Sequence, residues 1–175
     1  LADLARIGPD YLPGHAHADT LSFELSLGAQ RVIVNSGTSV YGLGAERLRQ
    51  RGTPAHSTVT VAGQDSSEVW SGFRVGRRAR PRVETVTAEG AEQGFVASHD
   101  GYRALPGTPR HSRRATLTAT GLRIEDRVTG RQAAQARYHL HPDVTVETSG
   151  TLGRLRLPDG REITLEASGT LRPEP

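Results

Sequence analysis

Two histidines separated by a single residue, His15 and His17, are the residues of this chain whose type and spacing most directly suggest chemistry. They come just before residues 20–27, where apolar and polar side chains alternate. Such alternation predicts a half-buried strand, on which side chains two residues apart project to the same side. The sequence therefore predicts two imidazoles aimed into one volume. This arrangement suits two ligands of one metal ion, or a metal ligand beside a general base.

Two further segments place polar residues at the ends of predicted strands. The apolar run 32–34 ends in Asn35, and His56 begins another run of alternating apolar residues. Strands that each deliver one side chain at the same end can build a three-point metal site. Because the chain contains no cysteine, its ligands must be imidazole, carboxylate or amide groups.

The composition limits the domain count and the classes of partner. The 175 residues are enough for one domain or slightly more. No apolar stretch approaches the roughly 20 residues of a membrane-spanning helix. All 22 basic residues are arginine, whose forked guanidinium suits the carboxylates and sulfates of an anionic polymer. The 19 acidic residues nearly balance them and no nucleic-acid motif is present, so nucleic acid is not expected as a partner.

The elements that position these residues are short strands separated by Gly, Pro, Asp and Asn. Turn signals every eight to twelve residues or so predict an all-β chain, a two-layer antiparallel β-sandwich of supersandwich type with little helix. One short helix is expected near 44–50, and Asp159-Gly160 predicts a tight hairpin between 155 and 163. We expect strands near 20–27, 30–35, 56–62, 68–75, 79–88, 93–99, 111–119, 121–128, 134–140, 143–148, 151–156 and 161–167.

The segments 14–23, 35–38, 55–64 and 138–144 resemble, in order and spacing, the C-terminal sandwich domain of the heparinase II/III-like polysaccharide lyases. The similarity extends over about residues 8–148. It implies a β-sandwich that normally follows an (α/α) toroid, with the substrate cleft between the two. Since the chain starts at Leu1 without a methionine, residues 1–175 are expected to be one such domain from which the toroid is missing.

The resemblance also implies a zinc ion held by His17, Asn35 and His56. Asn35 departs from the family pattern, which usually has an aspartate. An amide oxygen is neutral and a weaker zinc ligand than a carboxylate, so zinc binding is expected to be weakened and Asn35→Asp to tighten it. The alternative is that His17 and His56 form a buried pair held by hydrogen bonds.

The activity that the resemblance implies is β-elimination on an anionic, uronate-containing polysaccharide, such as a glycosaminoglycan or alginate, by a bacterial enzyme that is periplasmic or secreted. His15 and Tyr41 are the expected catalytic residues at the cleft. Arg49, Arg51 and Trp70 are candidates for substrate binding, with surface charge or core packing as the alternatives. Because further catalytic groups are expected on the toroid, the chain alone is expected to be inactive.

Two other functions remain open at this point. The chain could be a non-catalytic carbohydrate-binding or scaffolding domain, or a cupin-like metal enzyme. Cupins also use a His-x-His pair followed by a glutamate, but Glu24 lies too far after His17 for their usual spacing. The remaining histidines, His99, His111, His139 and His141, are expected to be structural or at the surface.

Overall fold

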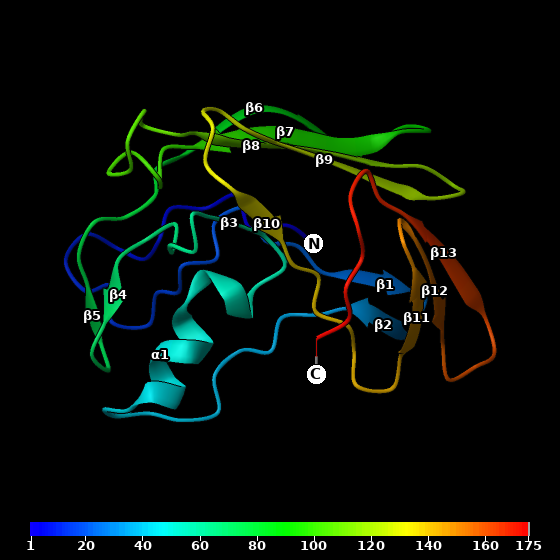
Figure 1. Cartoon of the computed structure of the whole chain (residues 1–175), viewed down its shortest axis with the longest axis horizontal. Helices are drawn as coiled ribbons and strands as arrows, with labels where there is room; N and C mark the ends of the chain where they lie inside the picture. The colour runs from blue at the N-terminus through cyan, green and yellow to red at the C-terminus, as the bar shows by residue number, and fades with distance from the viewer. Residues whose placement is uncertain (175) are drawn as a thin grey trace. The chain divides into compact units, whose positions relative to one another are not determined.

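The computed structural model describes residues 1–174 and consists of short antiparallel strands joined by irregular segments (Figure 1). The chain divides into two compact units. The larger contains Leu1–Phe23 and Asn35–His139, and the smaller contains Glu24–Val34 and the residues from Leu140 onward. The predicted all-β class with little helix is confirmed, and the several antiparallel sheets agree with the sandwich that was expected.

The main sheet of the larger unit is four-stranded and antiparallel (Figure 1). Its order follows the chain: β6 (Pro81–Thr87), β7 (Gln93–His99), β8 (His111–Leu117) and β9 (Leu122–Val128). Each of the sequence ranges expected for these strands lies within a few residues of the observed bounds. A hydrophobic cluster packs on the sheet and consists of Leu21, Phe95, Ala97 and Ala115.

Shorter elements complete the larger unit. They are α1 (Ala45–Arg51), the 3-10 turn η1 (Thr53–Ala55), β3 (Val59–Val61) paired with β10 (Ala134–Ala136), and β4 (Val69–Trp70) paired with β5 (Arg74–Val75). The helix is the one expected near 44–50. Its buried face is polar and consists of Arg47, Gln50 and Arg51. No helix within residues 1–174 is long and apolar enough to cross a membrane.

The smaller unit contains two sheets. One pairs β1 (Leu25–Leu27) with β2 (Gln30–Ile33), and the other has the order β11 (Thr145–Ser149), β12 (Leu152–Arg156) and β13 (Glu162–Glu166). The turns between the last three strands place Gly150 at φ 63° and Gly160 at φ 85°, a region that glycine enters without steric cost. The hairpin predicted around Asp159-Gly160 is therefore confirmed.

The prediction that the His15/His17 pair opens a strand over residues 20–27 is wrong. His15 lies in a turn closed by the Ala16 N–H on the Pro13 carbonyl at 3.0 Å, and the strand begins only at Leu25. The interruption occurs at Leu21, whose φ is 64°. A bulky residue in this left-handed region cannot continue a strand. The apolar alternation is real, but in place of a continuous strand this segment exchanges backbone hydrogen bonds with Asp3 at Leu21 and Ser22, and its Thr20 and Leu21 carbonyls accept from side chains of other elements.

Candidate metal centre and cleft

The loop that carries His17 is fixed by bonds to its backbone. The Ala18 N–H donates to the Arg51 carbonyl at 2.8 Å. The Ala18 carbonyl accepts from the Thr53 hydroxyl at 2.8 Å and from the Ser66 hydroxyl at 3.2 Å. Ala18 itself is completely buried. These contacts hold the backbone between His17 and Asp19 in place, although this segment is not part of a strand ladder.

The next residues of this loop are tied to the segment that begins with His56. The Thr58 hydroxyl donates to the Thr20 carbonyl at 3.0 Å. The buried Arg113 guanidinium donates to the Leu21 carbonyl at 2.7 Å and to the Ser57 carbonyl at 2.8 Å. Residues 17–21 and 56–58 are thus held side by side, although they are far apart in the sequence.

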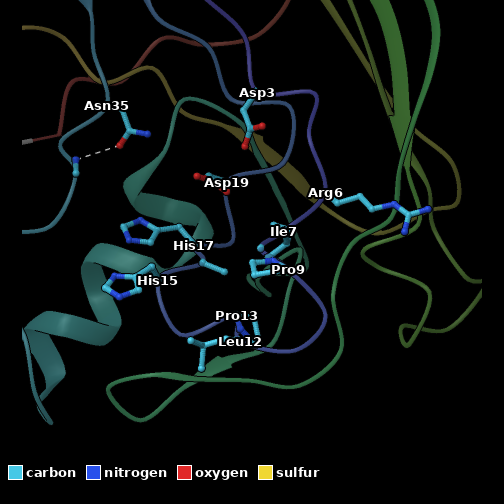
Figure 2. Close-up of a pocket in the computed structure, with 13 residues that line it drawn as sticks. Asp3, Arg6, Ile7, Pro9, Leu12, Pro13, His15, His17, Asp19 and Asn35 are labelled. Atoms are coloured by element: carbon cyan, nitrogen blue, oxygen red, sulfur yellow. Dashed lines mark hydrogen bonds between the residues drawn. The ribbon is translucent and has the colours of Figure 1, made fainter.

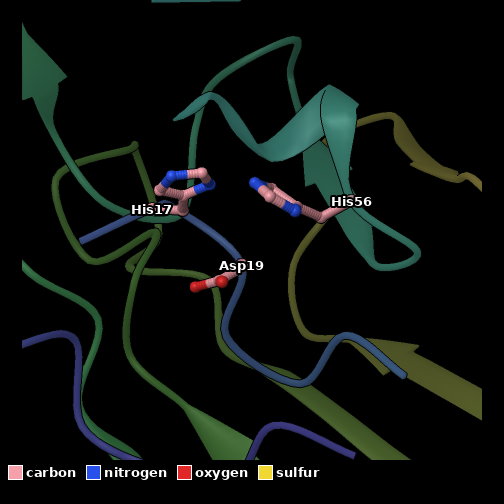
Figure 3. A group of neighbouring side chains, drawn as sticks. All are labelled: His17, Asp19 and His56. Carbon is pink, nitrogen blue, oxygen red and sulfur yellow. The ribbon is translucent and has the colours of Figure 1, made fainter. Parts of the chain in front are cut away.

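This arrangement brings His17, Asp19 and His56 together (Figure 3). One ligand atom of each lies within 4.8 Å of the other two, and the two imidazole centroids are 5.2 Å apart. His56 is fully buried, and neither of its ring nitrogens has a hydrogen-bond partner among the residues that the structure describes. An unpaired buried polar group is costly, and an ion would relieve that cost. Two imidazoles and a carboxylate therefore fit a divalent metal ion, with zinc among the ions that prefer them.

The protonation states of the cluster suit a cation. Burial lowers the pKa of His56 to about 3, with smaller contributions from His17 and His139. Burial also lowers the pKa of His17 to about 4, helped by Arg47 and other positive neighbours. Both imidazoles are consequently neutral near pH 7, the form that binds metals. Burial, followed by repulsion from Asp3, raises the pKa of Asp19 to about 7, so its charged form lacks a compensating cation.

A cleft of about 410 Å³ lies against this cluster (Figure 2). His17 and Asp19 line it, whereas His56 lies behind them. The other lining residues are Asp3, Arg6, Ile7, Gly8, Pro9, Leu12, Pro13, His15, Ala16, Asn35 and Gly37. The wall thus combines apolar side chains with a few ionisable groups, which is typical of a ligand site.

Of the three expected metal ligands, the structure brings His17 and His56 together and places Asn35 on the wall of the same cleft. The Asn35 side-chain oxygen accepts the Gly37 N–H at 3.1 Å (Figure 2). Asp19 was not among the ligands predicted from the sequence. Its signal was present, because it is a carboxylate two residues after His17 in the same motif.

The two expected catalytic residues are neighbours. His15 is exposed at the cleft, and its ring centroid lies 5.9 Å from that of Tyr41. Phe73 completes this group, 6.2 Å from His15 and 6.1 Å from Tyr41. The Arg47 guanidinium lies 5.1 Å from the Tyr41 ring centroid and 5.4 Å from that of Phe73. Arg47 was not selected from the sequence, because a helical arginine is usually exposed.

The three expected substrate-binding residues have different environments. Arg49 is exposed and forms a two-point ion pair with Glu46 at 2.8 and 2.7 Å. Trp70 is 52% exposed, with the Arg74 guanidinium 5.9 Å from its ring centroid. Arg51 is fully buried, and its side chain donates to the backbone carbonyls of Ala16, Ser71, Gly72 and Arg74. Arg49 and Trp70 are therefore open to a ligand, while Arg51 holds the fold together.

A second histidine cluster lies in the main sheet. His99 and His111 are paired across β7 and β8, with a ring-nitrogen distance of 3.0 Å. His111 contacts the Asp126 carboxylate at 2.7 Å, and Arg113 forms a two-point ion pair with that carboxylate at 2.8 Å. Both histidines are fully buried. This cluster matches the expectation that His99 and His111 have structural roles.

Comparison with known proteins agrees with this geometry. A heparinase II/III-like C-terminal family profile matches residues 1–175, the whole chain. No curated protein and no solved structure gave a significant match. The family match covers the motif of His15 and His17, the Asn35 turn and the His56 segment. The chain therefore belongs to the heparinase II/III-like polysaccharide lyase family, in which it corresponds to the C-terminal domain.

Proposed function

We propose that this chain is the β-domain of a lyase that cleaves a uronate-containing anionic polysaccharide by β-elimination. The observation that carries the proposal is the position of His15. It is exposed on the cleft wall, packs beside Tyr41, and shares the cleft with the candidate metal ligands His17 and Asp19. An imidazole base with aromatic neighbours and a cation site at one cleft suit an anionic sugar.

In this reaction the C5–H bond of the uronate breaks and the C4–O4 bond breaks, while the released electron pair forms the C4=C5 double bond. The His15 imidazole accepts the C5 proton, and an acid gives a proton to the departing O4. Tyr41 and Phe73 border the His15 ring and limit its orientation. The groups that complete the reaction belong to the toroid that the family resemblance implies.

The charge around the site favours an anionic ligand. Arg47 and Arg51 are buried and form no ion pair with a carboxylate among the described residues. One terminal nitrogen of Arg47 has no hydrogen-bond partner within residues 1–174. Buried guanidinium groups without a counterion raise the local potential and attract carboxylates or sulfates. Zinc bound by the metal cluster would add positive charge at the same cleft.

Two exposed side chains outside the cleft lining supply further sugar contacts in this proposal. Trp70 is half exposed and offers a face on which a sugar ring can stack. Arg49 is exposed and lies between the buried Arg47 and Arg51 in the sequence. A polymeric substrate of this kind is found outside the cytoplasm, which supports a periplasmic or secreted location.

The test is an elimination assay with the protein in its natural length, using glycosaminoglycan-type and alginate-type polymers. The ultraviolet absorbance of the unsaturated uronate product is followed. We expect His15→Ala to lower turnover by at least about 100-fold, the lower range for loss of a general base. His141→Ala, a substitution of a partly exposed histidine in the smaller unit, is the matched control and should retain activity.

Full turnover by His15→Ala would contradict the proposed role of this residue. A folded full-length protein that binds the polymers but releases no unsaturated product would instead support a carbohydrate-binding domain. Residues 1–175 alone are expected to be inactive, and robust turnover by them would contradict the division of the site between two domains.

A further inference from the structure

We infer that Asp19, and not Asn35, supplies the oxygen ligand of a metal ion held by His17 and His56. This inference deepens the proposed function by assigning the ligands of its metal centre. It does not depend on the elimination step, because it concerns only the three side chains of this cluster (Figure 3).

The first support is the convergence of three donor atoms on one point. The Asp19 carboxylate lies within 4.8 Å of a ring nitrogen of both His17 and His56. His56 is fully buried among these groups with both ring nitrogens unpaired. A neutral buried imidazole can satisfy its hydrogen-bonding groups in the protein or bind a metal, and here residues 1–174 offer His56 no partner.

The second support is the role that Asn35 already has. Its side-chain oxygen accepts the Gly37 N–H and thereby closes the turn after β2 (Figure 2). Asparagine often stabilises a turn in this way, by bonding to the backbone two residues further on. Asn35 also carries no charge, so with two neutral imidazoles it would leave a divalent ion uncompensated. Asp19 supplies the missing negative charge.

The third support is the rigidity of the Asp19 backbone. The Asp19 carbonyl accepts the Ser22 N–H at 2.8 Å, and the preceding residue, Ala18, is held at both its N–H and its carbonyl. The carboxylate is therefore presented by a fixed loop next to His17. Two histidines and one carboxylate form a known ligand set for zinc and leave one position open. Because His17 and Asp19 both line the cleft, that position would face it.

The experiment is a metal titration of the chain with Zn²⁺ by calorimetry, repeated with Co²⁺ by visible absorption. The unaltered chain should bind one ion. Asp19→Asn, which keeps the size of the side chain but removes its charge, should weaken binding at least about tenfold and change the cobalt spectrum. Asn35→Ala should alter the affinity by less than about threefold. Asp3→Asn is the matched control for loss of a nearby carboxylate and should retain the cobalt spectrum.

Circular dichroism and thermal melting without metal report whether each variant folds, and Asp19→Ser replaces Asp19→Asn if the latter does not. Unchanged affinity and an unchanged spectrum in the folded Asp19 variant would overturn the inference, as would loss of binding in Asn35→Ala. Absence of binding by the unaltered chain would overturn it as well. The elimination assay has no part in this readout, so the ligand assignment and the proposed activity can fail separately.

Discussion

Two clusters of two histidines and an aspartate lie in the larger unit, and they differ in how their polar atoms are satisfied. In the sheet cluster, the Gly101 N–H donates to His99 Nδ1 at 3.0 Å. His99 Nε2 must then carry the proton that is shared with His111 Nδ1, and His111 Nε2 in turn donates to Asp126. Every ring nitrogen of this cluster has a partner. In the loop cluster, neither ring nitrogen of His56 has one in the described part of the chain.

The contrast shows that residue type and burial do not by themselves identify a binding site. His56, His99 and His111 are all fully buried, and burial lowers the pKa of each. The difference is the backbone around them. Strand pairing places His99 opposite His111, so that their ring nitrogens form hydrogen bonds. The loop that presents His17 toward His56 instead leaves the ring nitrogens of His56 available to a ligand.

Arg113 connects the two clusters, and its loss should have the largest effect. Arg113→Ala leaves Asp126 without its guanidinium and releases the Leu21 and Ser57 carbonyls, so we expect a loss of about 3–5 kcal/mol in the free energy of unfolding. Urea denaturation measures it. Arg114→Ala is the control, since Arg114 is exposed and lies 4.0 Å from Glu125, and should cost less than about 1 kcal/mol. Equal effects of the two substitutions would contradict this connection.

Replacing one histidine of each cluster by leucine should separate their roles. His111→Leu removes the hydrogen-bond partner of His99 Nε2 and of the Asp126 carboxylate, so it should lower the metal-free stability by about 1–3 kcal/mol. His56→Leu removes two unpaired nitrogens, so the metal-free stability should be unchanged or higher while zinc binding is lost. Thermal melting with and without Zn²⁺ checks both. A large metal-free loss in His56→Leu would show that this histidine has a structural partner.

The stability of the metal-free protein should respond to pH through the loop cluster in two opposing ways. Because the pKa of folded His56 is about 3 and its ordinary value is 6.5, its contribution is complete above about pH 6.5 and is lost as the pH falls toward 3. The pKa of Asp19 is raised from 3.8 to about 7, so the stability contributed by its protonated form is lost as the pH rises between these values.

Zinc should prevent the loss of stability that ionisation of Asp19 causes, because the ion binds the charged carboxylate. The rise in melting temperature on adding Zn²⁺ should therefore be large near pH 7 and small near about pH 5, where a proton competes with the ion for the Asp19 carboxylate, whose pKa is about 7. The same series with Asp19→Asn is the control and should show no loss of metal-free stability toward pH 7. A zinc effect that does not vary with pH in this range would argue against Asp19 as a ligand.

The smallest effect concerns the bonds that hold the loop. Thr53→Val removes the hydroxyl that donates to the Ala18 carbonyl and should cost about 0.5–1.5 kcal/mol, with a measurable weakening of zinc binding. Ser112→Ala in β8 is the control, because the Ser112 hydroxyl makes only a 3.5 Å contact beside a complete strand ladder. Calorimetric titration that finds zinc affinity unchanged in Thr53→Val would show that this bond does not position the ligands.

The sequence by itself determined the parts of this protein that depend on local patterns. Alternating apolar residues and turn glycines located the main sheet and the hairpin with Gly160 at its turn, because burial of one strand face and a positive φ are encoded within a few residues. The motifs around His17 and His56 were enough to place these residues at one site and the chain in its family.

Only the tertiary structure decided which groups complete that site. The strand predicted through Leu21 is interrupted at the positive φ of this residue, where its carbonyl accepts from the guanidinium of Arg113, 92 residues away. Burial of Arg51 and the placement of Asp19 beside His56 depend in the same way on contacts between distant segments. Which groups form hydrogen bonds to a buried backbone depends on packing across the whole unit, so no short stretch of sequence specifies them.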